Sequence, residues 1–263
     1  MSYDINKIKD IIISTAKAEL LPRFTYVERQ HKKDGSILTE ADLVCQQRIA
    51  EQLQHHWPDT VFLGEEMTAE QQTELLNSEQ PIWCLDPLDG TSNFASGIPY
   101  FCVSLALIKK GKVELGVVYD PLRDECFAAN ESQVSLNGEP LLIKVSGLTL
   151  NQTTAIIDFK RLTPELACLI VQEVPYASQR SFGSVALDWC WLAMGRGHVY
   201  LHGRSNIWDY AAGHYIFNRA GGLSCTLEGD GIFVNQLIPR SSVGALDATL
   251  FEEWKNFLKI DIK

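Results

Sequence analysis

The chain has 263 residues, 46% of them hydrophobic, and a formal net charge of −10 at pH 7. This length allows one large domain or two smaller lobes with a proper hydrophobic core. The acidic balance argues against a general nucleic-acid-binding surface, which favours basic patches, but it leaves a phosphate substrate open because bound cations reverse the local charge.

The cysteines and the N-terminal residues bear on the cellular compartment. Seven cysteines are spread along the chain without C-x-x-C spacing, which favours buried free thiols in a reducing environment. The N-terminal residues have no signal-peptide core, and no apolar stretch reaches transmembrane length. We therefore expect a cytoplasmic protein without a membrane segment.

The first half of the chain predicts two helices followed by a strand-rich region. Residues 4–21 and 39–56 place apolar residues at helical spacing, and Thr39 is suited to cap the second helix. Apolar or alternating runs predict strands at 81–85, 100–108, 113–119 and 123–129, followed by a hairpin around Asn137-Gly138. The last of these strands suggest an antiparallel meander.

Strands and helices alternate after about residue 148. The strands are expected at 155–159 and 198–202, and the helices at 164–173, 185–194, 208–219 and 248–259. This rhythm is typical of an α/β fold. We therefore expect an α+β N-terminal lobe, residues 1–148, and an α/β C-terminal lobe, residues 149–263, that together form one catalytic unit.

The segment Asp86–Pro99, with the sequence DPLDGTSNFASGIP, is the most informative part of the chain. It follows the predicted strand 81–85, so Asp86 and Asp89 are expected where a strand ends and a helix begins. Pro87 makes this turn rigid because its ring fixes φ and keeps Asp86 out of the helical region. Carboxylates held in this way suit Mg²⁺, which prefers oxygen ligands, although Asp-Pro-x-Asp-Gly is also good turn chemistry.

The start of the helix that follows is suited to a phosphate. The backbone N–H groups of Gly90, Thr91 and Ser92 have no acceptor within that helix and lie at the positive end of its dipole. A metal ion and a phosphate would then meet within one short segment of the chain.

Two other segments also place acidic residues near apolar ones. The run Phe62-Leu63-Gly64 precedes the pair Glu65-Glu66, and such a pair by itself is usually a solvated surface rather than a cation site. Asp209 follows Trp208 and opens an Ala-rich stretch, where a helix N-cap explains it as well as a metal ligand does. Each segment is ambiguous by itself.

Taken together, these segments closely resemble the inositol monophosphatase family. The motifs are Gly-Glu-Glu, then Asp-Pro-Leu-Asp-Gly-Thr-Ser-Asn-Phe, then Trp-Asp-Tyr-Ala-Ala-Gly, and the resemblance extends from Lys33–Asp42 to Ala220–Gly222. It implies a layered αβαβα sandwich of the inositol monophosphatase and fructose bisphosphatase type. It also implies Mg²⁺-dependent phosphatase activity, lithium sensitivity and, in many members, a homodimer.

The resemblance further implies ligands for two Mg²⁺ ions and leaves a third ion near Glu65 open. Glu65, Asp86 and the backbone carbonyl of Leu88 are the implied ligands of the first ion. Asp86, Asp89 and Asp209 are the implied ligands of the second, so Asp86 would bridge the two. Ions in such two-metal phosphoryl-transfer sites lie roughly 3.5–4 Å apart.

The implied catalytic group contains Thr91, Asp42, Glu65 and Asp86. The hydroxyl of Thr91, paired with the carboxylate of Asp42, resembles the family's arrangement for orienting the attacking water. Glu66 is expected to lie farther from the metal ions than Glu65. Because water would attack the phosphorus directly, no nucleophilic Ser or Cys is needed and no phosphoenzyme is expected.

Substrate contacts are harder to predict than metal ligands. The phosphate- and substrate-binding candidates are Gly90, Thr91, Ser92, Ser184, His202 and Asp209. Ser184 lies in a segment similar to one that contacts substrate in the family, although a helix N-cap is equally consistent. His202 stands where inositol-type members carry an acid, and together with Arg204 it would suit an anionic leaving group, unless both belong to a solvated loop.

Several functions therefore compete. The first is a phosphatase of small sugar or polyol phosphates, inositol monophosphate included. The second is the same chemistry on a nucleotide, such as 3′-phosphoadenosine 5′-phosphate or NADP, with fructose 1,6-bisphosphate and histidinol phosphate as weaker options. The third is a non-enzymatic role, because some bacterial members resemble regulatory partners of the transcription or RNA machinery.

Overall fold

The computed structural model describes residues 2–24, 30–31, 37–65 and 67–261. In this part of the chain the strands form a seven-stranded sheet in the order β3-β4-β5-β6-β7-β8-β9, a five-stranded sheet in the order β11-β10-β12-β14-β13, and the small pair β1-β2. The strands are β1 (Gln30–His31), β2 (Ile37–Leu38), β3 (Val61–Gly64), β4 (Ile82–Asp89), β5 (Cys102–Lys109), β6 (Lys112–Asp120), β7 (Glu125–Asn130), β8 (Val134–Leu136), β9 (Glu139–Pro140), β10 (Thr154–Asp158), β11 (Ser178–Arg180), β12 (Val199–Ser205), β13 (Leu223–Cys225) and β14 (Arg240–Ala245).

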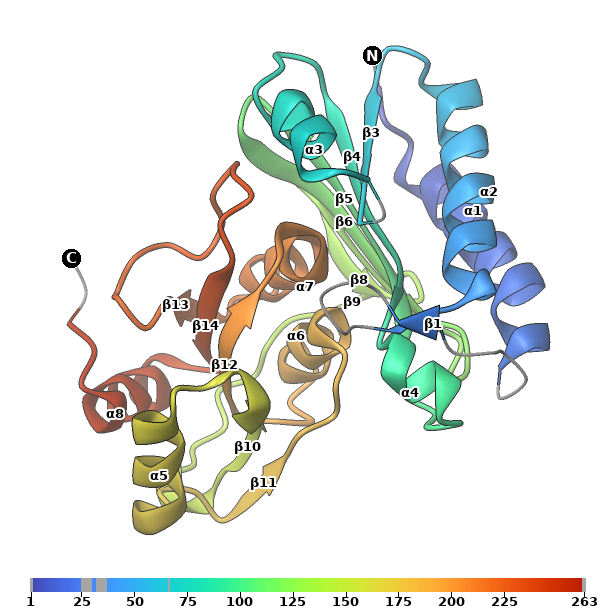
Figure 1. Cartoon of the computed structure of the whole chain (residues 1–263). Coiled ribbons are helices and arrows are strands. Elements are labelled where there is room, and N and C mark those ends of the chain that lie inside the picture. The colour runs from blue at the N-terminus through green and yellow to red at the C-terminus, as the bar shows by residue number, and fades with distance from the viewer. Residues whose placement is uncertain (1, 25–29, 32–36, 66, 262–263) are drawn as a thin grey trace.

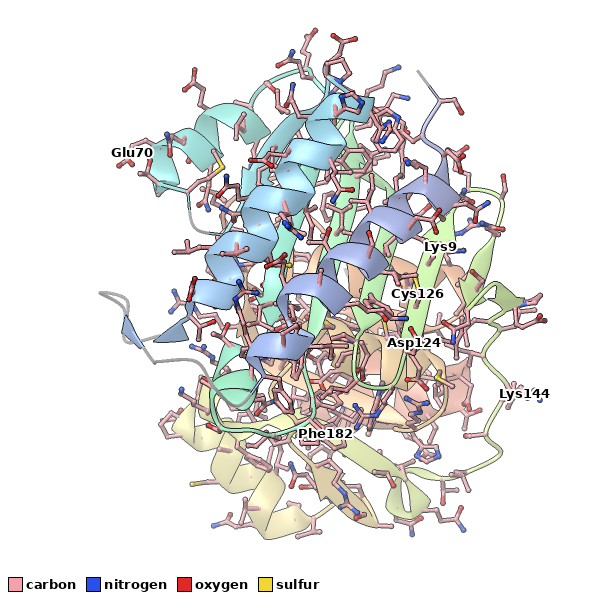
Figure 2. The ribbon with its side chains drawn as sticks, turned by 90° about the vertical axis from the view of Figure 1, so that its right-hand side faces the viewer. Lys9, Glu70, Asp124, Cys126, Lys144 and Phe182 are labelled. Atoms are coloured by element: carbon pink, nitrogen blue, oxygen red, sulfur yellow. The ribbon has the colours of Figure 1, made fainter. Side chains whose placement is uncertain are left out.

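The helices form layers on both sides of each main sheet (Figure 1). They are α1 (Ile5–Glu19), α2 (Glu40–His56), α3 (Ala69–Leu76), α4 (Thr91–Ala95), α5 (Pro164–Glu173), α6 (Val185–Ala193), α7 (Ile207–Arg219) and α8 (Ala248–Leu258), with short 3₁₀ turns η1 (Leu21–Arg23), η2 (Leu150–Gln152) and η3 (Phe159–Arg161). Helices α1 and α2 cover one face of the seven-stranded sheet, as Figure 2 shows from the side of Lys9 on α1. Helices α6 and α7 lie between the two sheets, and α8 packs on the far face of the smaller one.

Three hydrophobic cores hold these layers together. Ile8 and Ile12 of α1 belong to the core between the first two helices and the larger sheet. Trp189 of α6 and Phe217 of α7 lie in the core between the sheets. Trp254 of α8 lies in the core on the outer face of the smaller sheet, which also includes residues of α5. The expected layered αβαβα sandwich is confirmed.

The two sheets differ in strand direction. In the larger sheet only β3 and β4 pair in parallel, and the other pairs are antiparallel, as expected for a meander. In the smaller sheet β10 pairs in parallel with β11 and β12, whereas β14 pairs antiparallel with β12 and β13. The larger sheet precedes residue 148 and the smaller one follows it, while the division into lobes 1–148 and 149–263 stays a prediction.

The sequence patterns do not predict α3 or the short strands β11, β13 and β14. They also predict that the strand before Asp86 ends at residue 85, whereas β4 continues to Asp89. Within the described residues, no helix has the length and apolar character needed to cross a bilayer.

Candidate active site

A bulge in β4 brings Asp86 and Asp89 to the same side of the sheet. Residues three apart in a regular strand point to opposite faces. Here Asp86 pairs with Ser104 of β5 and Asp89 pairs with Cys102, so three steps along β4 match two steps along β5. The extra residue is a β-bulge, and it includes Pro87, which lacks the N–H that a regular ladder would need.

Gly90 turns the chain from β4 into the short helix α4. Its φ is +98°, in the left-handed region that favours glycine. A Cβ at this position would lie 3.0 Å from the carbonyl oxygen of Tyr100 and 3.2 Å from the Cα of Phe101. Only glycine therefore fits, and the turn places Thr91 directly after the two aspartates.

The structure brings Thr91 and Asp42 together from elements that are far apart in the sequence. The Thr91 hydroxyl lies 3.1 Å from Asp42 Oδ1 and 2.9 Å from the carbonyl oxygen of Leu88, so these two acceptors share its proton. Thr39 fixes the other oxygen of the same carboxylate. Asp42 Oδ2 accepts hydrogen bonds from the backbone N–H and the hydroxyl of Thr39, at 2.7 Å and 2.6 Å. Thr39 caps α2 as expected.

Asp89 links the larger sheet to the start of α6, the helix that lies between the two sheets. Its Oδ2 accepts hydrogen bonds from Ser184 Oγ and from the backbone N–H of Ala186, both at 2.7 Å. Ser184 is the buried N-cap residue of α6, but its hydroxyl is directed to Asp89 rather than to the helix backbone. Ser184 thus stands at the N-cap position without capping α6 through its side chain, and its contact with substrate stays a prediction.

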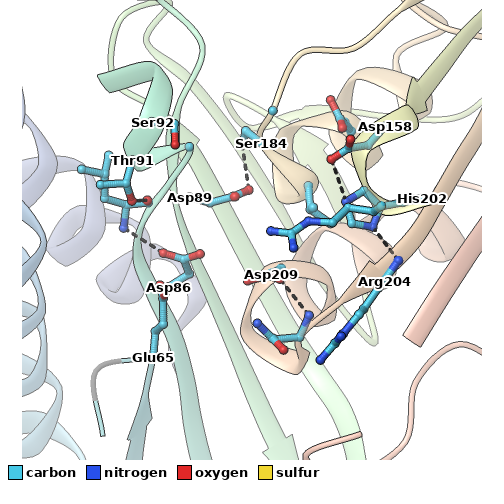
Figure 3. Close-up of a pocket in the computed structure, with 17 residues that line it drawn as sticks. Glu65, Asp86, Asp89, Thr91, Ser92, Asp158, Ser184, His202, Arg204 and Asp209 are labelled. Carbon is cyan, nitrogen blue, oxygen red and sulfur yellow. Dashed lines mark hydrogen bonds and ion pairs between the residues drawn. The ribbon is translucent and has the colours of Figure 1, made fainter. Parts of the chain in front are cut away.

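Asp209 reaches the same site from the C-terminal half of the chain. It occupies the third position of α7, and its Oδ2 accepts from the backbone N–H of Asn206 at 2.8 Å. Glu65 follows β3, which lies beside β4. A cavity of about 440 Å³ is lined by Glu65, Asp86, Leu88, Asp89, Gly90, Thr91, Ser92, Ser184, His202 and Asp209, among others (Figure 3).

The carboxylates of this cavity perturb one another. Burial, followed by the charges of Glu65, Asp89 and Asp209, raises the pKa of Asp86 well above its ordinary value. Burial, followed by the charges of Asp89 and Glu65, also raises the pKa of Asp209. Burial raises the pKa of Asp89 to about 6 against the opposing hydrogen bonds from the start of α6. Unless an opposite charge is present, these groups resist ionising together.

The donor set fits a hard divalent cation. Among the described residues, no three His, Cys, Asp or Glu side chains already have the spacing of a metal site. The aspartates instead accept local hydrogen bonds, since Asp86 Oδ1 accepts from the backbone N–H of Leu88 at 3.0 Å. The acidic side of the cavity nevertheless offers only oxygen ligands, and a bound cation would relieve the repulsion between its carboxylates. This side consists of Glu65, Asp86, Leu88, Asp89 and Asp209.

His202 lies on the opposite side of the cavity from Glu65 and Asp86 (Figure 3). Its side chain is buried, and its Nε2 lies 3.3 Å from Asp158 Oδ2. Its Nδ1 accepts from the backbone N–H of Arg204 at 3.3 Å. Both ring nitrogens of His202 are therefore engaged with the protein itself.

Three charged residues of the cavity are missing from the sequence-based candidates. Asp158, Arg161 and Asp188 all line it. Asp158 could have been found, because strands 155–159 and 198–202 are both predicted and, if they pair in parallel, their ends meet at one edge of the sheet. In the structure Asp158 is the register partner of His202. Glu66 and residues 33–36 of the N-terminal motif lie outside the described residues.

Comparisons with known proteins agree with this architecture. A model of the inositol monophosphatase family matches residues 4–255. Inositol monophosphatase 1 of Solanum lycopersicum is 39% identical over 202 residues, which are 73% of this chain and 73% of that protein. The Nus factor SuhB of Xylella fastidiosa is 32% identical over 231 residues, 84% of this chain and 82% of that protein. The structure of an inositol monophosphatase from Thermotoga maritima matches with a TM-score of 0.82 at 26% identity, covering 95% of this chain and 94% of that one.

The layered fold, the acidic cavity and these matches define a phosphatase, that is, a phosphoric monoester hydrolase. More particularly, the chain belongs to the inositol monophosphatase family, whose model covers nearly its whole length. Members of this family are generally metal-dependent.

Proposed function

We propose that this protein is a Mg²⁺-dependent phosphatase that hydrolyses a small phosphate monoester, such as inositol monophosphate or a related sugar or polyol phosphate. The observation that carries the proposal is the convergence of Glu65, Asp86, Asp89 and Asp209 on one cavity together with Thr91. Water attacks the phosphorus directly in this mechanism, and no side chain forms a covalent intermediate.

The proposed ligands of the ions are the oxygen atoms of the acidic side. Glu65, Asp86 and the carbonyl of Leu88 would hold one Mg²⁺, and Asp86, Asp89 and Asp209 would hold a second. When bound, Mg²⁺ lowers the pKa of water and neutralises charge on the phosphoryl group and the leaving oxygen.

The side chains around the ions have separate tasks in this mechanism. Thr91 accepts a hydrogen bond from the attacking water, and Asp42 holds the Thr91 hydroxyl in place because Thr39 fixes the Asp42 carboxylate. We propose that the backbone N–H groups of Gly90, Thr91 and Ser92 bind the phosphoryl oxygens. Ser184 acts by orienting Asp89. We also propose that His202 borders the leaving group.

The proposal can be tested by phosphate release from a panel of monoesters with Mg²⁺ and then with EDTA. The panel holds inositol 1-phosphate, fructose 1,6-bisphosphate, 3′-phosphoadenosine 5′-phosphate, NADP and histidinol phosphate. We expect turnover that EDTA abolishes and excess Mg²⁺ restores. Asp86→Asn should remove it, since Asp86 serves both proposed ion sites. Turnover that survives EDTA, or no turnover with any ester, would contradict the proposal.

A second candidate function is a regulatory binding role in the transcription or RNA machinery. It is favoured by the relative from Xylella fastidiosa that carries the name Nus factor SuhB. A pull-down with Asp86→Asn separates the two roles, because binding survives this substitution whereas hydrolysis does not.

We also propose that the protein is a cytoplasmic homodimer. Its seven cysteines are free, and all except Cys168 are buried, as a reducing compartment would allow. The dimer is carried over from the family, and sedimentation of the purified chain would test it.

A further inference from the structure

Two arginines line the cavity, together with the carboxylates Asp158 and Asp188. They are Arg161 of η3 and Arg204 of β12. Figure 3 shows Arg204 beside His202, on the opposite side of the cavity from Glu65 and Asp86. The side chains of Arg161 and Arg204 are exposed, and neither guanidinium makes a hydrogen bond or an ion pair to another described residue.

A close backbone contact holds the two arginines near each other. Gly203 precedes Arg204, and a Cβ at this position would fall on the carbonyl oxygen of Arg161 and lie 3.1 Å from the backbone nitrogen of Leu162. Because Gly203 has no side chain, η3 can pack directly on β12. The contact fixes the backbone of Arg161 against the residue that precedes Arg204.

The carboxylates on this side are already engaged. Asp158 accepts from the backbone N–H of Lys160 at 3.0 Å and pairs with His202. Burial acts to raise the pKa of Asp158, but these partners outweigh it and the pKa is lowered. Asp188 accepts from the Tyr100 hydroxyl at 2.9 Å, and burial raises its pKa, which favours the neutral form. The charge of Arg161 also acts on Asp158 and Asp209, without a hydrogen bond or an ion pair to either carboxylate. The guanidinium groups therefore keep their hydrogen-bond donors for a ligand.

A second hollow lies beside the cavity at Arg204. It has a volume of about 350 Å³, and its charged lining residues are Arg204, Arg240, Glu228 and Asp230. A leaving group can therefore extend past Arg204 without leaving the protein surface.

We propose that this enzyme prefers a phosphate ester whose leaving alcohol carries a second phosphate, and that Arg161 and Arg204 bind this second phosphate. The inference rests on the proposed phosphatase function and specifies its substrate class. Guanidinium groups are suited to this task because they stay charged and form paired hydrogen bonds with phosphate oxygens. Sugar bisphosphates and nucleotides with a second phosphate share this chemistry.

The test compares substrates that differ only in the second phosphate. One pair is fructose 1,6-bisphosphate and fructose 1-phosphate, and the other is 3′-phosphoadenosine 5′-phosphate and adenosine 3′-monophosphate. For at least one pair we expect kcat/KM to be about 10- to 100-fold higher for the bisphosphorylated member, since two charge-assisted contacts are gained. The pair with the larger ratio identifies the sugar or the nucleotide as the source.

Variants assign the preference to the two arginines. Arg161→Gln and Arg204→Gln should each lower the ratio about tenfold, mainly through KM of the bisphosphorylated substrate. Lys160→Gln removes a neighbouring exposed charge that does not line the cavity, and it should keep the wild-type ratio. Hydrolysis of both members of each pair with equal efficiency, or ratios that both arginine variants leave unchanged, would overturn the inference while leaving the phosphatase function intact.

A binding measurement separates this inference from the proposed function. Calorimetric titration of the Mg²⁺-loaded protein with fructose 6-phosphate and with adenosine 5′-monophosphate requires no turnover. We expect one of them to bind, and both arginine variants to weaken it about tenfold. Arginine-dependent binding without hydrolysis of any ester would refute the phosphatase and retain the phosphate site. Binding that is absent, or insensitive to both variants, would refute the site.

Discussion

The hydroxyl of Thr91 is the group that the proposed mechanism assigns to the attacking water. Thr91→Ala eliminates the group that lies between Asp42 and the carbonyl of Leu88. We expect kcat for phosphate release to fall about 100-fold or more, because a positioned proton-handling group contributes about that much. Thr91→Ser keeps the hydroxyl and should stay within about tenfold of the wild type. Steady-state kinetics with Mg²⁺ would measure both, and a Thr91→Ala variant with near-normal kcat would refute the assigned role.

His214, a buried residue of α7, makes the stability of the fold depend on pH. Its ring packs against Trp189, and its Nε2 lies 2.9 Å from Ser224 Oγ and from Asn218 Nδ2. Burial lowers its pKa to about 3. In the unfolded chain the imidazole of His214 binds a proton below about pH 6.5. In the folded chain it stays neutral until the pH approaches 3. Stability is therefore complete above pH 6.5 and is lost as the pH falls toward 3.

The expected slope from this histidine is up to about 1.4 kcal/mol per pH unit below pH 6.5. Urea denaturation at several pH values would measure it, and His214→Gln should flatten the profile in this range relative to the wild type. His55→Gln, on the exposed end of α2, is the control. Parallel profiles for the wild type and His214→Gln would show that His214 does not titrate as described.

At the residue scale, motif spacing and the family resemblance name the proposed metal ligands. They leave out three charged residues that also line the cavity, Asp158, Arg161 and Asp188. Asp86, Asp89 and Thr91 are close in sequence, so a turn can be read directly from the motif. The backbone of Arg161 lies against Gly203, the residue before Arg204, only because Gly203 has no side chain and lets η3 pack on β12. Contacts of this kind depend on tertiary packing, which leaves no periodic pattern in the sequence.

The turn between β4 and α4 allows a matched test of backbone strain. Gly90 and Gly138 both have positive φ, but a Cβ at Gly90 would press on Tyr100 and Phe101, whereas nothing lies within 4 Å at Gly138. We expect Gly138→Ala to cost about 1 kcal/mol of unfolding free energy. Gly90→Ala should cost about 2–4 kcal/mol and lower kcat, because it adds a steric clash to that strain. Urea denaturation would compare the two, and equal costs would contradict the steric argument.

At the element scale, helices are easier to predict than the strands of the smaller sheet. The range 164–173 is predicted as a helix and α5 has those bounds, since Thr163 caps it and Pro164 suits its first position. Strand β14, with the sequence RSSVGA, has few large apolar residues, yet it lies between β12 and β13. Its burial comes from its neighbours, so neither alternation nor an apolar run marks it.

At the scale of the whole molecule, the site depends on both sheets. Asp86 and Asp89 come from the larger sheet, and Asp209 comes from α7, which packs between the sheets. The layering was implied by the family resemblance and could not be obtained from periodicity, because periodicity assigns elements but not their partners. The hydrogen bonds from Ser184 and Ala186 to Asp89 now give a physical reason why the two halves meet at the site.

The central claim is that carboxylates from both halves bind Mg²⁺ at one site, and calorimetric titration of the metal-free protein with Mg²⁺ tests it most directly. Asp209→Asn keeps the oxygen that accepts from Asn206 but removes the charge, and Asp59→Asn is an exposed control. We predict at least two bound ions in the wild type and in Asp59→Asn, and the loss of at least one in Asp209→Asn. No binding to the wild type, or the same binding to Asp209→Asn, would contradict the account.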